Sequence, residues 1–238
     1  MPNHWTMTLP DSSLYDSATY VVDMSELPSP LQEMLPKATF LGRGASSAAW
    51  KLENGTVFKL TTDEAACSFH RWQQMEKKPH LPQILELGSI GVALPVFAAG
   101  ASSSWERWYF VVQPFYGPVE PHLWETLSAI AQPVGASQCK SRPGWGKTKN
   151  GLMAHGQLAH EHLVQLERVF SKEPCLAQAA AAVSMLAVWW KQARGQPGLD
   201  VDKSENWAMN NATDELVLLD PVYGNDKTTS GVHWGAEI

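Results

Sequence analysis

Residues 199–222 read LDVDKSENWAMNNATDELVLLDPV. Within this stretch, WAMNN and ELVLLDP are typical of two short strands of a hairpin, with Asn206 and Asp220 at its ends, fourteen residues apart. Turn chemistry alone accounts for an asparagine and an aspartate at such ends. The apolar run before Asp220 favours a metal site instead, because it delivers a carboxylate to the end of a buried strand. Mg²⁺ binds such carboxylate oxygens together with phosphate oxygens. The stretch therefore raises the hypothesis that Asn206 and Asp220 hold a metal–nucleotide complex, in which case either Asp200 or Asp202 should be the base beside them.

The composition is that of a folded protein with a buried core. The 238 residues are 44% hydrophobic and 18% charged, which argues against global disorder and suffices for one large domain or two small lobes. The formal net charge is −6 at pH 7, so the basic footprint of a nucleic-acid-binding protein is missing and we expect no such partner. Three widely spaced cysteines without a C-x-x-C pair argue against a disulfide framework or a zinc ribbon.

No stretch of the sequence is typical of export or membrane insertion. The first residues, MPNHWTMTLPDSS, lack a basic region followed by an apolar run and so do not resemble a signal peptide. The longest nearly apolar run, AQAAAAVSMLAVWW, is shorter than the roughly 20 residues that span a bilayer. We therefore expect a soluble, cytoplasmic protein without a membrane partner.

The expected elements divide the chain into a sheet part and a helical part. Strand patterns (ATFLGRGASSAAWKL, GTVFKLTT, ILELGSIGVALPVF and WERWYFVVQPFYG) surround one helical pattern, EAACSFHRWQQMEKK, and later stretches are mainly helical. We predict an α+β fold with an N-terminal antiparallel sheet lobe that includes one helix and a mostly helical C-terminal lobe. The predicted divisions are an N-terminal extension at 1–37, the sheet lobe at 38–117, and the helical lobe at 118–238, in which 118–173 has no assignment.

Two features of the sheet lobe carry chemistry. Gly42 and Gly44 in GRGASSAAW let backbone approach a ligand closely, with N–H groups available for phosphate oxygens, although a plain tight turn explains the same glycines. Lys59 lies inside the apolar strand VFKL, where a lysine costs free energy unless an anion pairs with it. The alternative is that Lys59 points to solvent from an edge strand.

Four motifs in this order resemble those of protein kinases. They are LGRGASSAAW, VFKL, the Asp-rich loop ending at Asn206, and LLDPV around Asp220. They are most similar to the small serine/threonine kinases that lytic tailed phages of the podovirus type encode early, which end the glycine loop with Ala-Ala-aromatic and carry D-P-V where cellular kinases carry D-F-G. The resemblance covers roughly residues 38–117 and 175–224. It implies a minimal two-lobed protein kinase-like fold that binds ATP and Mg²⁺ between the lobes.

The resemblance also implies roles for single residues. Those that it places on the nucleotide are Gly42, Gly44, Ser46, Ser47, Lys59, Glu76 and Gln113. Lys59 would pair with the phosphates and with a helix glutamate, for which Glu76 has the usual separation and Glu64 is the alternative. Gln113 would begin the connector whose backbone lies near the adenine, and Asn206 and Asp220 would hold Mg²⁺.

The implied activity is transfer of the ATP γ-phosphate to Ser/Thr of host proteins, and to the chain itself, in the bacterial cytoplasm. This family carries its catalytic aspartate five residues before the metal-binding asparagine, and here that position is Val201. Asp200 and Asp202 flank it, and Asp200 is favoured because it follows the apolar Leu199. A kinase without a positioned base would be slowed by about 10²–10⁴-fold.

Two alternatives share the nucleotide site. The first is a pseudokinase-like binding protein that inhibits a host factor by occupying it, without phosphoryl transfer, and Val201 favours this one. The second is a small-molecule phosphotransferase, although the short stretch after Val222 leaves little chain for an extra substrate pocket.

Overall fold

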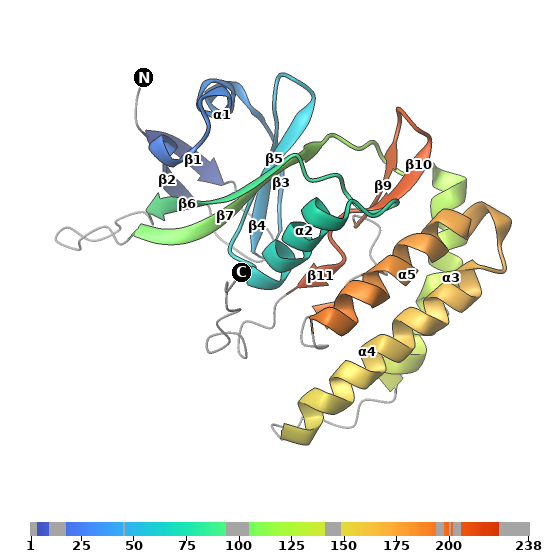
Figure 1. The fold of residues 1–238 in the computed structure, drawn as a ribbon. Helices are drawn as coiled ribbons and strands as arrows, with labels where there is room; N and C mark the ends of the chain where they lie inside the picture. Colours follow the sequence, from blue (N-terminus) through green and yellow to red (C-terminus); the bar gives the residue numbers. More distant parts are fainter. Residues whose placement is uncertain are drawn as a thin grey trace. The chain divides into compact units, whose positions relative to one another are not determined.

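The computed structural model describes residues 4–9, 18–44, 46–93, 105–140, 149–193, 198–199, 201 and 206–223. The chain divides into two compact units (Figure 1), Met1–Met75 with Gln83–Phe115 and Glu76–Pro82 with Tyr116–Ile238. The first unit is built on an antiparallel sheet and the second is mostly helical. The predicted α+β class, with a sheet part preceding a helical part, is confirmed.

A seven-stranded antiparallel sheet forms the centre of the first unit, in the order β1-β2-β6-β7-β5-β4-β3. Its strands are β1 (His4–Leu9), β2 (Ala18–Asp23), β3 (Thr39–Arg43), β4 (Ser47–Lys51), β5 (Thr56–Thr61), β6 (Glu86–Ala93) and β7 (Trp105–Pro114). Helix α2 (Glu64–Glu76) connects β5 to β6. Strand β5 therefore lies inside the sheet, between β4 and β7.

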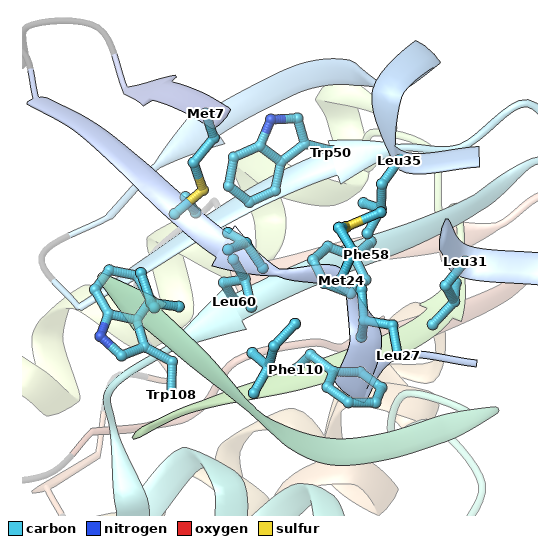
Figure 2. Packing of buried hydrophobic residues seen from close by; sticks show 14 of the residues in the cluster. Met7, Met24, Leu27, Leu31, Leu35, Trp50, Phe58, Leu60, Trp108 and Phe110 are labelled. Carbon is cyan, nitrogen blue, oxygen red and sulfur yellow. The ribbon is translucent and has the colours of Figure 1, made fainter. Parts of the chain in front are cut away.

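The register of β5 against β7 separates the two faces of the sheet. Phe58 lies opposite Val112 and Leu60 opposite Phe110, so these four side chains share one face. The rings of Phe58 and Phe110 stack with their centroids 5.8 Å apart (Figure 2). Because side chains alternate along a strand, Lys59 points to the other face.

The segment between β2 and β3 covers the apolar face. It forms η1 (Met24–Glu26), α1 (Ser29–Met34) and η2 (Leu35–Lys37). Its buried side chains join the sheet's apolar residues in one cluster and are Met24, Leu27, Leu31 and Leu35 (Figure 2). Each such side chain contributes about 1.5–3 kcal/mol when fully buried, so this segment belongs to the core of the unit.

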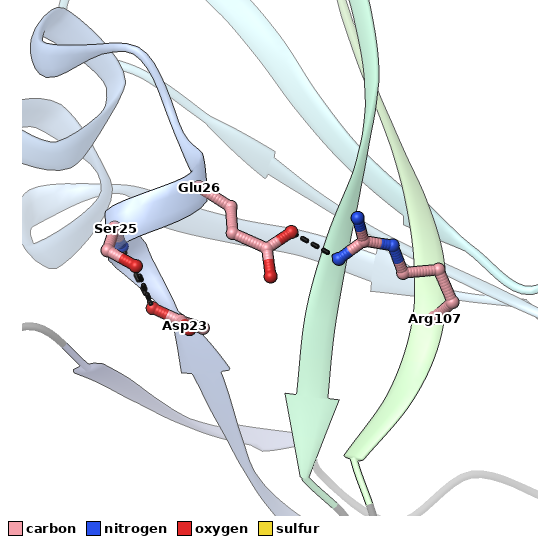
Figure 3. A network of polar contacts seen from close by, with 4 residues as sticks. All are labelled: Asp23, Ser25, Glu26 and Arg107. Carbon is pink, nitrogen blue, oxygen red and sulfur yellow. Dashed lines mark hydrogen bonds and ion pairs between the residues drawn. The ribbon is translucent and has the colours of Figure 1, made fainter.

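Residues 1–37, expected as an extension, thus supply part of the sheet, and the strands β1 and β2 were not predicted. Strand β2 pairs with β6 at Val22↔Val92. An ion pair between Glu26 of η1 and Arg107 of β7 joins the two chain segments on the surface (Figure 3). Such exposed pairs add about 0–1 kcal/mol, so the strand pairing and the apolar cluster contribute more.

Asp23 caps the short helix η1. Its Oδ1 accepts hydrogen bonds from the Ser25 hydroxyl at 2.7 Å and from the Ser25 backbone N–H at 3.0 Å (Figure 3). The Ser25 hydroxyl, followed by the backbone bond and the His4 charge, lowers the pKa of the Asp23 carboxyl against the opposing effect of burial. The turn that leads from β2 into the covering segment is therefore held by a local carboxylate.

Helices dominate the second unit. They are α3 (Pro121–Lys140), α4 (Lys149–Phe170), η3 (Pro174–Leu176) and α5 (Ala177–Gln192), accompanied by β8 (Gly198–Leu199), the hairpin β9 (Trp207–Asn210) and β10 (Glu215–Leu218), and β11 (Val222–Tyr223). Leu163 and Leu166 of α4 and Leu186 of α5 are fully buried. The previously unassigned region 118–173 is thus largely α3 and α4. Among the described residues, no helix is long and apolar enough to cross a membrane.

The close contact between Gly88 and Phe110 generates a prediction. A Cβ at Gly88 would lie 2.5 Å from Cε1 and 2.7 Å from Cζ of Phe110, whose ring is buried against Phe58. We expect Gly88→Ala to lower the free energy of unfolding by about 1–3 kcal/mol, the usual cost of overpacking, measured by urea titration. Gly42→Ala is the control, because a Cβ there meets no atom within 4 Å. Equal midpoints for both variants would contradict the packing described.

Candidate functional site

One row of residues crosses four strands of the sheet. Gly42 of β3 pairs with Ala49 of β4, Ala49 with Lys59 of β5, and Lys59 with Val111 of β7. Directly opposed residues share a face, and adjacent strands are about 4.8 Å apart, so the backbones of Gly42 and Lys59 are about 10 Å apart. The glycine loop and the lysine that the sequence singled out therefore share one face.

Lys59 is a buried cation at the centre of this row. Its side chain is 9% exposed and β5 is an interior strand, so the alternative of a solvent-facing lysine on an edge is wrong. Val111, which lies opposite Lys59, is fully buried. Gln113 lies two residues further along β7 on the same face and is 7% exposed. A buried ammonium favours a compensating anion, because transfer of a charge out of water is costly.

The loop between β3 and β4 contains Gly44 and Ser46, and Ser47 begins β4. The Gly44 N–H donates to the Ser47 carbonyl at 2.8 Å, and the Ser46 carbonyl accepts from the Thr62 N–H at 2.9 Å. Neither Gly42 nor Gly44 has a positive φ, and a Cβ on Gly44 would come no closer than 3.3 Å, to the Ser47 hydroxyl. The backbone conformation therefore does not demand these glycines, and open space lies over Gly42.

Helix α2 lies on the face that carries Lys59. Asp63 caps it, since its Oδ1 accepts from the N–H groups of Ala65 at 2.8 Å and Ala66 at 3.0 Å. Tyr109, on the Lys59 face two residues before Val111, has a raised pKa because of burial and then the nearby α2 groups Cys67 and Glu64, with the α2 residue Arg71 opposing. These influences place the first turns of α2 beside Tyr109.

The buried stripe of α2 contains polar residues that sequence reasoning missed. Ala66, Phe69, His70 and Gln73 stand at i, i+3, i+4 and i+7, and His70 and Gln73 are only 1% and 2% exposed. Positions with this spacing form the inward face of a helix. The signal was readable, because two polar side chains occupy positions that the periodicity assigns to the interior.

The two α2 carboxylates lie outside that stripe. Glu64 is exposed in the first turn, and Glu76 is exposed at the last residue of the helix. The carboxylate of Glu76 lies 3.0 Å from the Lys78 ammonium. The expected ion pair between Lys59 and a glutamate of α2, Glu76 or the alternative Glu64, stays a prediction.

In the second unit, the hairpin expected from the sequence holds Asn206 and Asp220 at one end. Leu218 pairs with Trp207, and the Leu219 N–H donates to the Asn206 carbonyl at 2.7 Å. Asn206 directly precedes β9 and is 7% exposed, and Asp220 follows Leu219. The backbone therefore brings the amide and the carboxylate to the same open end of the hairpin.

The donor chemistry of this pair fits Mg²⁺. An amide oxygen and a carboxylate are hard ligands, and Mg²⁺ is usually held by one or two carboxylates, with waters and substrate phosphates completing its shell. Within the part of the chain that the structure describes, no group of three or more His, Cys, Asp or Glu side chains is placed to hold a metal ion. Asn206 and Asp220 are thus suited to an ion that arrives with a phosphate ligand.

The position where the resembled family carries its base is a core position in this chain. Val201 is 1% exposed, and its carbonyl accepts the indole N–H of Trp207 at 2.8 Å. Leu199 pairs with Val222, two residues after Asp220. Leu199 and Val201, the two neighbours of Asp200, are therefore both held near the open end of the hairpin. Asp200 and Asp202 themselves lie outside the described residues.

No protein-family model and no curated protein matches the chain. Among solved structures, the chain is similar to the aminoglycoside phosphotransferase APH(2'')-Ib in a crystal structure with ADP bound. The two are 12% identical, and the similarity covers 83% of this chain and 73% of that chain with a TM-score of 0.30. At this TM-score, the similarity carries no argument about function.

The packing of α2 predicts how its cysteine reacts. Burial, reinforced by Glu64 and Asp63 and opposed by Arg71, raises the pKa of the Cys67 thiol to about 11, whereas Cys175 is exposed. Because the thiolate is the nucleophile, we expect iodoacetamide at pH 8 to modify Cys175 in the folded protein and to reach Cys67 only after unfolding. Mass spectrometry of the peptides measures both sites. Equal rates in the folded protein would show that α2 does not cover this face.

Proposed function

We propose that this chain is a protein kinase of the phage serine/threonine type, which binds ATP with Mg²⁺ and transfers the γ-phosphate to host proteins in the bacterial cytoplasm. The observation that carries the proposal is the row that joins Gly42 to Lys59 across the sheet. It combines a glycine with open space above it and a buried cation on the same face, and both features suit the binding of a triphosphate.

The order of elements around the row supports the same reading. Strands β3, β4 and β5 are followed by α2 and then by β6 and β7, with the lysine in the third strand of the series. Protein kinases use a glycine-rich loop over the phosphates and a lysine on the third strand. In the second unit, Asn206 and Asp220 at the open end of the hairpin provide the metal-binding donors that such an enzyme requires.

Each group has a role in the proposed reaction. Lys59 would pair with phosphate oxygens, and the open space over Gly42 would let the triphosphate approach the backbone closely. Asn206 and Asp220 would hold Mg²⁺, which supplies charge neutralisation on the phosphates. Asp200 would accept the proton of the substrate hydroxyl. Most of the catalysis would come from positioning and electrostatic stabilisation, because phosphoryl transfer needs little covalent chemistry from the protein.

A second candidate function rests on Val201. This buried residue has a hydrocarbon side chain, so it supplies no base at the position where the resembled family carries one. A chain in which neither Asp200 nor Asp202 replaces that base would bind nucleotide without acting through phosphoryl transfer. Such a pseudokinase-like protein would inhibit a host factor by occupying it.

Transfer of labelled γ-phosphate tests the proposal. With ATP and Mg²⁺, we expect the full chain to label itself and proteins of a bacterial lysate, and Lys59→Ala and Asp220→Asn to reduce the rate at least about 10²-fold through lost charge stabilisation. Asp200→Ala should cost about 10²–10⁴-fold if Asp200 is the base. A larger loss in Asp202→Ala would assign the base to Asp202.

Matched variants control for surface charge. Lys37 is 63% exposed and lies 3.5 Å from Glu53, and Asp214 lies in the exposed turn of the hairpin. Lys37→Ala and Asp214→Asn should retain transfer, because exposed ion pairs and turn charges contribute little. Folded wild-type protein that binds ATP without transferring phosphate would favour the second candidate. Folded protein that does not bind ATP would exclude both.

A further inference from the structure

Gln113 is a buried carboxamide on the face of the sheet that carries Lys59. It pairs with Val57 on β5, while Lys59 pairs with Val111, two residues before it on β7. Diagonal neighbours of this kind lie about 7–8 Å apart, so Gln113 and Lys59 stand on one face at a short separation. The residue is 7% exposed.

The acceptor end of this side chain is unsatisfied within the part of the chain that the structure describes. The Oε1 atom of Gln113 is buried and accepts no hydrogen bond among the described residues. Val57, opposite Gln113 on β5, and Val111, two residues before it on β7, are both apolar and buried. A buried acceptor without a donor costs free energy, and an apolar side chain would satisfy this position better. A ligand donor would remove that cost.

We propose that Gln113 is a specificity-determining residue that recognises adenine through its side chain, with Oε1 accepting a hydrogen bond from the 6-amino group of the base. This inference rests on the proposed nucleotide site. Glutamine is suited to adenine because the base offers a donor and an acceptor side by side, as the carboxamide does. Guanine carries a carbonyl oxygen at position 6, which would place a second acceptor against Oε1.

Binding to the full chain with Mg²⁺, measured by calorimetry, tests the inference with three probes. These are ATP, GTP and purine riboside triphosphate, which has no group at position 6. The wild type should prefer ATP over both others by about 10-fold or more, the discrimination expected for one well-made base contact. Gln113→Met and Gln113→Leu should bind all three within about 3-fold of one another, since neither side chain retains the acceptor.

Gln32, a partly buried glutamine of the same unit, provides the control. Gln32 donates from Nε2 to the Leu27 carbonyl at 2.7 Å, so Gln32→Met should lower thermal stability and keep the preference for ATP. Equal wild-type affinity for ATP and purine riboside triphosphate would overturn the inference without any variant. A preference that survives in both Gln113 variants would also overturn it, while leaving the nucleotide site intact. Wild-type protein that binds none of the three would overturn the proposed function as well.

Discussion

The register between β5 and β7 determines what each face of the sheet in the first unit can do. With Lys59 opposite Val111, the residues on either side of each fall on the other face, where Phe58 and Phe110 stack in the apolar cluster. A slip of β5 by one residue would bring the lysine into that cluster and move Phe58 out of it. The apolar core and the buried cation are therefore held by the same pairing, and the proposed chemistry depends on the packing behind it.

The fold was predictable where local patterns were strong. Helical periodicity predicted α2, and strand patterns predicted the hairpin β9–β10. The sequence suggested one strand over residues 38–52, whereas the structure has β3 and β4 on either side of the glycine loop. The strands β1 and β2 escaped prediction because they lie in a polar, Pro-punctuated stretch, and β2 pairs with β6, far along the chain. Such non-local pairing leaves no local signature.

The candidate site likewise has residues that the sequence predicts and residues that only the structure reveals. Residues whose type is unusual for their element, such as Lys59 in an apolar strand, were readable from the sequence alone. The burial of His70 and Gln73 on α2, and the core position of Val201, depend on which face of an element is covered. Gln113 was expected to contribute only its backbone, and its buried Oε1 became visible once the register put it beside Val57 on the face of Lys59.

The central claim is that Lys59 lies beside the phosphates of a bound nucleotide. An acyl-phosphate derivative of ATP transfers its acyl group to an amine next to the phosphates, and mass spectrometry locates the modified lysine. The account predicts acylation of Lys59 that excess ATP with Mg²⁺ prevents, whereas any acylation of the exposed Lys37 and Lys51 should be insensitive to ATP. Acylation confined to exposed lysines, or unchanged at Lys59 by excess ATP, would contradict it.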